Sequence, residues 1–199
     1  MALKFQYNKT FLQQLGKGLK VRENALPTLA AKEAALRVEV KKARESVVAI
    51  ERQLAGTYDT QTGILRFWNE FPDNLVGVRE VRVDIKKIAG VKTPVLQEVL
   101  FSVERYSAFL LPAWLPRGIE SLKEIVRLRI EAELAKKKVE ILEYARKKTT
   151  QKVNLYEKVQ IPEYQEAIRK IKRFMEDEDN LSKSSQKILK AKIAAMEAA

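Results

Sequence analysis

The sequence predicts a mainly α-helical protein, in which a long antiparallel two-helix coiled coil carries a small cap containing a β-hairpin in the middle of the chain. Five of the seven glycines and four of the six prolines lie in residues 56–118, whereas residues 119–199 contain no glycine. Both flanks repeat apolar residues at intervals of three and four. Since glycine and proline disfavour helix interiors, we expect an N-terminal coiled-coil helix (1–55), a β-hairpin and irregular cap region (56–118) and a long C-terminal coiled-coil helix (119–199).

The first flank carries the longer uninterrupted repeat. Alternate steps of three and four residues from Leu12 to Leu54 visit thirteen positions, of which eleven are apolar. A seven-residue repeat of this length is typical of a coiled coil. The two exceptions, Arg22 and Glu33, could set the register or contact a partner, although we favour tolerated defects. Pro27 lies inside the repeat, which keeps its phase on both sides, so we expect a kinked continuous helix.

The second flank repeats in the same way from Ile125 to Tyr156, and the apolar positions then move by one residue, to Ile161 and onward. Pro162 follows this shift directly. We therefore expect a shallow kink between Lys158 and Pro162. A continuous helix over 119–196 would be about 115 Å long at 1.5 Å per residue, which predicts a rod.

Two such helices most simply fold back on each other, each burying its apolar seam. Counting outward from the connection places Leu54 near Ser121 and Thr10 near Tyr164. The last thirty or so residues should then project as a single helix, and Pro162 should lie where the first helix runs out. The predicted seam residues are Leu36, Val40, Val47, Ile50, Leu54, Ile125, Leu128, Val139 and Leu142.

The middle of the chain predicts a β-hairpin. Val81, Val83 and Ile85 alternate with polar residues, and a second alternating run from Val95 follows Gly90. Alternation with a period of two, interrupted by a glycine-containing turn, is typical of antiparallel strands. Aromatic residues flank the hairpin, and we expect most of them to pack in the cap and the remainder to serve a partner surface. They are Phe67, Trp68, Phe71, Phe109 and Trp114.

Composition excludes much of the usual enzyme chemistry. The chain has no cysteine and no histidine, so disulfides, thiolate nucleophiles, imidazole bases and Cys/His zinc sites are impossible. "LGKGLK" (15–20) follows no strand and lies on the seam, so we do not expect it to bind phosphate. The acidic run 176–179 points in several directions on a helix and is interpreted as solvated surface. We expect no enzymatic activity, catalytic residue, cofactor or metal.

Charge and hydropathy limit location and partners. No signal-peptide pattern opens the chain and no run of about 20 apolar residues occurs, so we expect a soluble protein of a reducing compartment. The net charge of +12 comes from 11 basic and 5 acidic residues in 1–55, 8 and 7 in 56–118, and 19 and 14 in 119–199. Because acids are mixed with the bases, a solvated helix surface fits better than a phosphate-tracking stripe. A basic coiled-coil scaffold and a nucleic-acid-binding coiled coil remain alternatives.

One segment carries a family resemblance. "VNLYEKVQIP" (153–162) fits a V-N-x-x-E-x-V-x-I-P pattern through Val153, Asn154, Glu157, Val159, Ile161 and Pro162. Together with the segment 8–36 and the hairpin spacing of Val81, Val83, Gly90, Lys92 and Pro94, it resembles the D subunit of the V-type/A-type ATPases. Heptads alone would not supply Asn154 and Pro162.

The resemblance implies a non-catalytic rotor axle in the central stalk, which couples ATP hydrolysis or synthesis to ion translocation through the membrane ring. The implied partners are the hexamer of catalytic A and noncatalytic B subunits, the F subunit, and a funnel-like subunit above the ring. The implied place is cytoplasmic and peripheral to the membrane, with no direct binding of nucleotide or nucleic acid. From the basic excess on the helices we hypothesise that the following residues face the hexamer: Lys9, Lys17, Lys20, Arg22, Arg169, Lys170 and Arg173.

Overall fold

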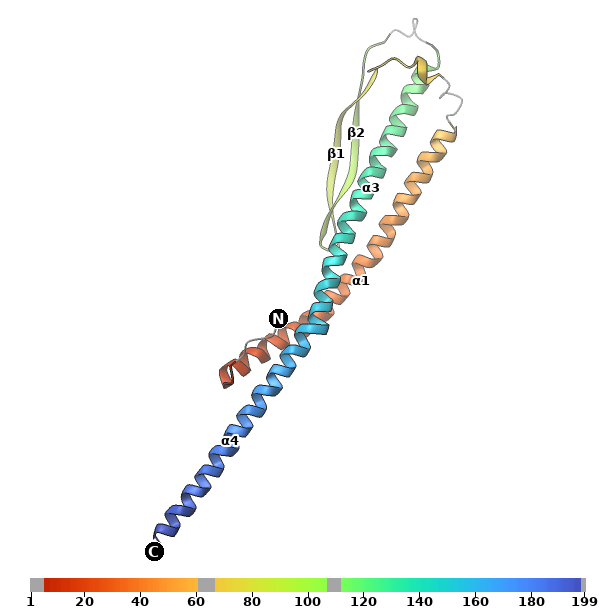
Figure 1. Cartoon of the computed structure of the whole chain (residues 1–199). Helices are drawn as coiled ribbons and strands as arrows, with labels where there is room; N and C mark the ends of the chain where they lie inside the picture. Colours follow the sequence, from red (N-terminus) through yellow and green to blue (C-terminus); the bar gives the residue numbers. More distant parts are fainter. Residues whose placement is uncertain (1–5, 61–66, 107–111, 198–199) are drawn as a thin grey trace. The chain divides into compact units, whose positions relative to one another are not determined.

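A computed structural model of the chain describes residues 6–60, 67–106 and 112–197, with the side chains of residues 68 and 197 left out. The elements in order are helix α1 (Lys9–Thr60), a 3-10 turn η1 (Trp68–Glu70), strands β1 (Val76–Ile88) and β2 (Val91–Val103), helix α3 (Leu115–Leu155), a π-helical turn η2 (Tyr156–Gln160) and helix α4 (Ile161–Glu197). The predicted fold class is confirmed: long helices precede and follow an antiparallel hairpin (Figure 1).

The chain divides into two compact units, and helices α1 and α3 contribute residues to both of them. The central unit is Lys32–Lys148, and the terminal unit combines Met1–Ala31 with Thr149–Ala199. Helix α1 therefore contributes its first part to the terminal unit and its second part to the central unit. Each unit has an apolar core of its own.

Helix α1 begins at a side-chain cap and continues through its proline. The side-chain oxygen Oδ1 of Asn8 accepts a hydrogen bond from the Phe11 amide at 2.6 Å, which satisfies one of the free amides of the first turn. The helix then runs for 52 residues with Pro27 inside it. The predicted continuity of this helix across Pro27 is confirmed.

The hairpin is longer than its alternating residues indicate. Strands β1 and β2 have thirteen residues each and pair antiparallel from Val76–Val103 to Ile88–Val91, with one extra residue in each strand, Arg79 in β1 and Gln97 in β2. Ala89 and Gly90 both have positive φ, 48° and 78°, as a two-residue turn of type I′ requires. The predicted glycine turn is confirmed, and Ala89 tolerates the left-handed conformation that glycine adopts without strain.

The tip of this hairpin forms a third layer on the helices of the central unit. Buried residues Leu36, Val40 and Ala43 of α1 meet Leu142 of α3, and Ile88, Ala89 and Val91 at the hairpin tip pack against them. Beside the tip, the Thr93 hydroxyl is fully buried and donates to the Lys86 carbonyl at 3.0 Å. The hairpin tip therefore covers apolar surface that two helices alone would leave exposed.

The predicted register between the helices of the central unit is wrong. Lys136 donates to Glu51 at 3.0 Å, and Arg44 pairs with Glu143. The predicted alignment would have placed Glu51 near Glu124. The error arises because α3 begins beyond the level at which α1 ends (Figure 1).

The first turns of α3 have their own apolar cluster. Leu75, Leu115 and Ile119 are buried together, with Phe71 and Trp114 packed against them. The ring of Trp114 stacks on Phe67 at 5.7 Å between centroids and tilts against Phe71 at 6.3 Å. Three of the five aromatics expected in the cap thus contact one another, whereas Phe109 and the side chain of Trp68 lie outside the described residues. This cluster joins the start of α3 to the segment that leads into β1.

In the terminal unit, α1 pairs with α4. Leu15 is buried with Ala167 and Ile171, while the rings of Tyr7 and Phe174 lie 4.7 Å apart. Pairing thus extends past Pro162, and Tyr164 lies beside Gly18 rather than near Thr10 as the sequence predicted. The expectation that the first helix runs out at Pro162 is wrong, because the two helices continue together to about Met175.

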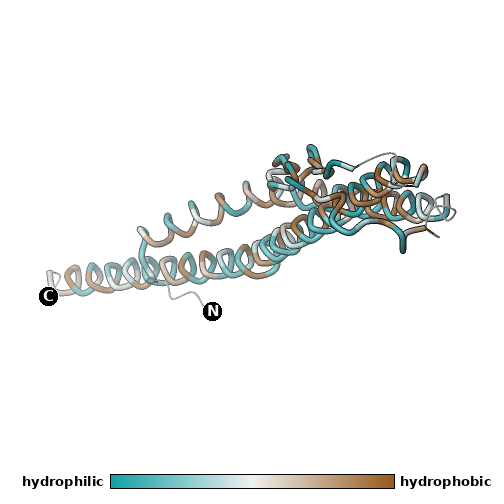
Figure 2. The backbone as a smooth tube through the Cα atoms, turned by 90° about the horizontal axis from the view of Figure 1, so that it is seen from above, coloured by the Kyte–Doolittle hydropathy of each residue, from teal (hydrophilic) through white to brown (hydrophobic). Residues whose placement is uncertain are grey.

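Beyond Met175 the remaining described side chains of α4 are exposed. All residues of 176–196 fall in the exposed class, including apolar ones. Hydrophobic and hydrophilic segments alternate along the helix that ends at the C terminus (Figure 2). A single projecting helix was predicted, and the structure shows one that begins about a heptad later. Its exposed large apolar residues are Leu181, Ile188, Leu189, Ile193 and Met196.

Candidate partner-binding surface

The segment between Tyr156 and Pro162 departs from α-helical geometry. The Ile161 amide donates to the Tyr156 carbonyl, five residues back, and residues 156–160 form the π turn η2. An α-helical Pro162 would press its ring against the Lys158 carbonyl four residues back. The wider π turn precedes that position and relieves the clash. The shallow kink expected between Lys158 and Pro162 stays a prediction, and what the structure shows at this place is a π turn.

The π turn also explains the shift in the apolar repeat. Thr149, Val153 and Tyr156 are buried or partly buried at steps of four and three, and the next such positions in phase are Ile161 and Tyr164. The step from Tyr156 to Ile161 is five residues instead of four. A π turn holds one residue more than an α turn, so the same side of the helix faces α1 before and after it.

The motif residues divide between the two sides of this helix. Val153 and Ile161 are partly buried toward the paired side. Asn154, Glu157, Val159 and Pro162 are exposed, and the Val159 side chain retains 41% of its accessible surface. Four of the six residues that carry the resemblance are therefore available to another molecule, which packing within the unit does not explain.

Arg22, an exception in the heptad repeat, lies between the two helices. Its Nε donates to the Gln160 side chain at 2.8 Å, its Nη1 donates to the Gly18 carbonyl at 2.9 Å, and its guanidinium lies 4.2 Å from the centre of the Tyr164 ring. Such stacking combines cation–π attraction with directional hydrogen bonds. The favoured interpretation of Arg22 as a tolerated defect is wrong, since the residue joins α1 to η2 and α4.

The other exception, Glu33, is also engaged. Its carboxylate accepts from Arg37 at 3.1 Å, one turn along α1, and only 13% of its side-chain surface is exposed. Both interruptions of the repeat thus carry specific polar contacts. A charged residue on a coiled-coil seam is a signal that could have led to these contacts, but the sequence does not reveal which partners it meets.

The remaining basic residues hypothesised to face a partner lie at the surface of the terminal unit. Lys9, Lys17 and Lys20 on α1 are exposed, as are Arg169, Lys170 and Arg173 on α4. These six residues, without Arg22, are called the basic surface below. Both helices contribute residues to the basic surface. A partner that surrounds this unit would therefore contact positive charge from both helices.

One member of the basic surface has a partner of its own. Lys170 donates to Glu166 at 2.9 Å, one turn back on α4. This hydrogen bond, with the charge attraction that accompanies it, lowers the pKa of the Glu166 carboxyl below its ordinary value and raises the pKa of Lys170 above its ordinary value. Both side chains are more than half exposed, so the pair is screened by solvent and contributes little to stability.

The predicted seam residues all lie on inward sides of the central unit. Val47, Leu128 and Val139 are partly buried, and Val139 packs against the core around Leu142. The other six retain at most 8% of their surface. They are Leu36, Val40, Ile50, Leu54, Ile125 and Leu142.

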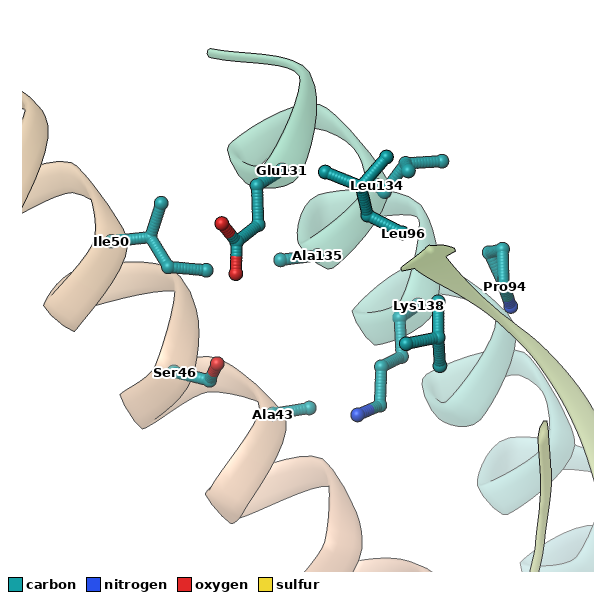
Figure 3. A pocket seen from close by; sticks show the side chains of 10 residues that line it. Ala43, Ser46, Ile50, Pro94, Leu96, Glu131, Leu134, Ala135 and Lys138 are labelled. Carbon is teal, nitrogen blue, oxygen red and sulfur yellow. The ribbon is translucent and has the colours of Figure 1, made fainter. Parts of the chain in front are cut away.

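A shallow hollow of about 210 Å³ lies in the central unit where α1, β2 and α3 meet. Figure 3 shows Glu131 and Lys138 of α3 extending toward α1, where Ser46 and Ile50 lie. Apolar side chains supply most of the remaining lining, among them Pro94, Val95 and Leu96 of β2. One carboxylate and one ammonium among apolar neighbours suit packing between three elements better than they suit catalysis.

The carboxylates and the helices of the described residues indicate neither a metal site nor a membrane span. Within 6–60, 67–106 and 112–197, no group of three or more carboxylates is placed to hold a metal ion. The acidic run Glu176–Asp179 is exposed, as expected for solvated helix surface. In that part of the chain, none of the helices is both long and apolar enough to cross a membrane.

Sequence reasoning missed the residues that surround Arg22. Tyr164 was expected in the repeat, opposite Thr10, but Gly18 and Gln160 were not singled out as its neighbours, although a Cβ on Gly18 would lie only 2.8 Å from the Tyr164 ring. The shift in the repeat did mark the position of the π turn. What the sequence could not show is that the shift lies inside the paired region.

Comparison with known proteins gives one consistent result. The model of the family described as the D subunit of ATP synthase matches residues 11–191. Several relatives are named as the D subunit of a V-type ATP synthase. The protein from Borreliella burgdorferi is 29% identical over 96% of this chain and 95% of its own length. Those from Chlamydia caviae and Chlamydia trachomatis serovar L2 are 30% and 31% identical, over 86% and 84% of this chain and 85% of their own.

Proposed function

Because this chain belongs to the family of ATP synthase D subunits, we propose that it is the non-catalytic central-stalk component of a V/A-type rotary ATPase. In this role it acts as a shaft that couples ATP hydrolysis or synthesis in a hexamer of A and B subunits to ion translocation through a membrane ring. The proposed partners are that hexamer, the F subunit and a funnel-like subunit above the ring. The proposed place is the cytoplasmic side, peripheral to the membrane.

The observation that supports this role most directly is that the terminal unit buries apolar residues between its helices and exposes basic residues on its outer sides. Apolar residues of both helices, such as Leu15 and Ile171, are used in pairing, while the basic surface is exposed on both helices. A shaft that turns inside a hexamer needs inner contacts that keep its helices together and outer contacts that can be exchanged. The first requirement is met by buried packing and the second by exposed charge.

Exposed charged contacts suit a rotating interface for an energetic reason. An ion pair at an exposed site contributes about 0 to 1 kcal/mol, so no single contact would hold the shaft at one angle. A cavity lined by acidic residues would still attract a basic shaft at long range. We therefore propose the six residues of the basic surface as hexamer-facing and leave out Arg22, whose guanidinium is engaged with Gln160 and Tyr164.

The experiment is reconstitution of the chain with purified A, B and F subunits. We expect the chain to join the hexamer, to raise its ATP turnover, and to rotate when a bead is attached to it. A test variant changes Lys9, Lys17, Lys20, Arg169, Lys170 and Arg173 to glutamine, and we expect weaker assembly that falls further as salt increases.

A control variant changes exposed basic residues of the central unit to glutamine, namely Arg52, Arg127, Lys137 and Lys147. It should leave assembly closer to that of the unmodified chain. Equal assembly by the test variant and the unmodified chain would contradict the hexamer-facing assignment. Purification with nucleic acid that dissociates steeply with salt, and no binding to the hexamer, would favour the nucleic-acid alternative.

A further inference from the structure

The π turn leaves one backbone carbonyl without its usual donor. Along a helix, the Glu157 carbonyl could accept from the amide four or five residues ahead, at Ile161 or Pro162. Ile161 donates to Tyr156 instead, and proline has no N–H. Neither of these two positions of the described helix can therefore satisfy this carbonyl, and residue 157 is exposed. A carbonyl that lacks both donors, on an exposed residue, can accept a hydrogen bond from water or from a donor group of another molecule.

Pairing of the helices does not require the extra residue. If one residue of η2 were absent, the step from Tyr156 to Ile161 would be four, and the alternation of three and four would continue without a break to Tyr164, Ile168, Ile171 and Met175. An uninterrupted α-helix with the same buried side is thus available to this sequence. The π turn and Pro162 both reduce helix stability, and the apolar packing of α1 on α4 does not account for them, although Gln160 of the turn does accept a hydrogen bond from Arg22 of α1.

The side chains that the π turn displays indicate the nature of the contact. Asn154, Glu157, Lys158 and Val159 are exposed, as is Pro162. They combine an apolar side chain, a proline ring and polar groups around an unsatisfied acceptor. This combination fits a protein surface that offers one donor side chain next to apolar atoms, and fits a uniform anionic surface poorly.

We propose that the π turn η2 is a docking site of this chain, at which the Glu157 carbonyl accepts a hydrogen bond from an arginine, lysine or amide side chain of the surrounding hexamer. The proposal rests on the proposed function for the identity of the partner. In this proposal the binding group is a backbone carbonyl, whereas the residues of the basic surface would bind through their charged side chains. The extra residue and Pro162 together keep that carbonyl free of its own helix.

The main test uses the full chain with Lys158 deleted and Pro162→Ala introduced, so that 149–197 can form one α-helix with its buried side unchanged. Affinity for the purified hexamer of A and B subunits is measured by titration, and helix content and thermal unfolding are measured on the same samples. We expect unchanged or higher thermal stability, together with hexamer binding that is weaker by about tenfold, the size of one hydrogen bond to a charged donor.

A second variant, Pro162→Ala alone, keeps the residue count and supplies an amide that can donate to the freed carbonyls. We expect it to stabilise the chain and still weaken hexamer binding by a fewfold, a combination that loss of structure cannot produce. Glu157→Gln is the matched control, because it changes the side chain and leaves the carbonyl, and its affinity should stay within about twofold of the unmodified chain.

The outcomes separate this inference from the proposed function. If the unmodified chain fails to bind the hexamer, both are overturned. If it binds, and the deletion variant and Pro162→Ala bind equally well, only the docking role of η2 is overturned. If Glu157→Gln lowers the affinity for the hexamer as much as Pro162→Ala does, the assignment of binding to the Glu157 carbonyl is overturned.

Discussion

The two units of this chain contain the same kind of apolar helix repeat but pack it in different ways. In the central unit, the hairpin tip adds a third layer, and Leu36 and Leu142 are fully buried beneath it. In the terminal unit, two helices pair without a sheet, and the contact between them includes Arg22, Gln160 and Tyr164 as well as apolar residues. Where the hairpin tip adds a third layer, the core can be apolar. Where only two helices meet, specific polar contacts contribute to their pairing as well.

The difference extends to what each unit leaves exposed. The central unit has ion pairs that cross between its helices, such as Lys136 with Glu51. The terminal unit presents the basic surface, the π turn and the last turns of α4, where 176–196 are all exposed. Contacts that stabilise the fold are concentrated in the central unit, and groups that a partner could contact are concentrated in the terminal unit. Four substitutions or conditions test this contrast, from the largest expected effect to the smallest.

The largest effect is expected in the core under the hairpin. Leu36→Ala should lower the free energy of unfolding by about 2–5 kcal/mol, because it leaves a cavity where the hairpin tip meets both helices. Val38→Ala, two residues away on the same helix and 52% exposed, is the control and should change it by no more than about 0.5 kcal/mol. Denaturant unfolding followed by circular dichroism measures both. Similar losses in the two variants would contradict a dominant buried core in the central unit.

The second prediction compares two glycines of α1 in the terminal unit. A Cβ at Gly16 would meet no atom within 4 Å, whereas a Cβ at Gly18 would lie 2.8 Å from the Tyr164 ring. Gly16→Ala should therefore stabilise the chain by up to about 1 kcal/mol through helix propensity. Gly18→Ala displaces the ring stacked on Arg22, so it should be less stable than Gly16→Ala by about 1–3 kcal/mol. Thermal unfolding of both variants checks this, and equal stabilisation would show that the Tyr164 contact does not constrain the pairing.

A smaller effect is expected from ion pairs between helices. The Lys136–Glu51 pair of the central unit is about half exposed on both sides. A double-mutant cycle with Lys136→Ala and Glu51→Ala should give a coupling of roughly 0.2–1 kcal/mol that falls with added salt. The intrahelical pair Lys41–Glu45, at 4.0 Å, serves as reference and should couple less. A coupling above this range would mean that charge pairs, rather than the hairpin, dominate the central unit.

The smallest effect concerns pH. The lowered pKa of Glu166 means that its contribution is present above the unfolded-state pKa and is lost as the pH falls through the lower folded-state pKa, on the acid side of neutral pH. The raised pKa of Lys170 means that its contribution is present below the unfolded-state pKa and is lost as the pH rises through the higher folded-state pKa, on the alkaline side of neutral pH. The chain contains no histidine, so stability should be nearly flat between these limits.

Thermal unfolding of the unmodified chain and of Glu166→Gln across this pH range measures the contribution of the pair. The two curves should differ by a small, constant amount near neutral pH and converge at acid pH. A steep change in stability between pH 6 and pH 8 would contradict the assignment of the titrating groups.

Much of the fold and part of the candidate surface could be predicted from the sequence. Apolar periodicity predicted both long helices, and alternation around Gly90 predicted the hairpin. The shift of the repeat after Tyr156 marked the position of the π turn, because an extra residue in a helix must appear as an extra residue in its repeat. The contacts of Arg22 were not predictable, since a repeat shows which side of a helix is inward and does not show what lies opposite.

The sequence by itself determined the helices, the hairpin, the inward side of each helix and the place where that side shifts. Only the tertiary structure decided the register, which differs from the predicted one by eight positions at Tyr164, where Gly18 lies in place of Thr10. The physical reason is that a heptad seam resembles itself after sliding by about seven residues, so its apolar contacts alone distinguish poorly between such registers. Two contacts fit in one register only: Gly18 against the Tyr164 ring, and Arg22 with Gln160. They select that register, and they form only once the helices are side by side.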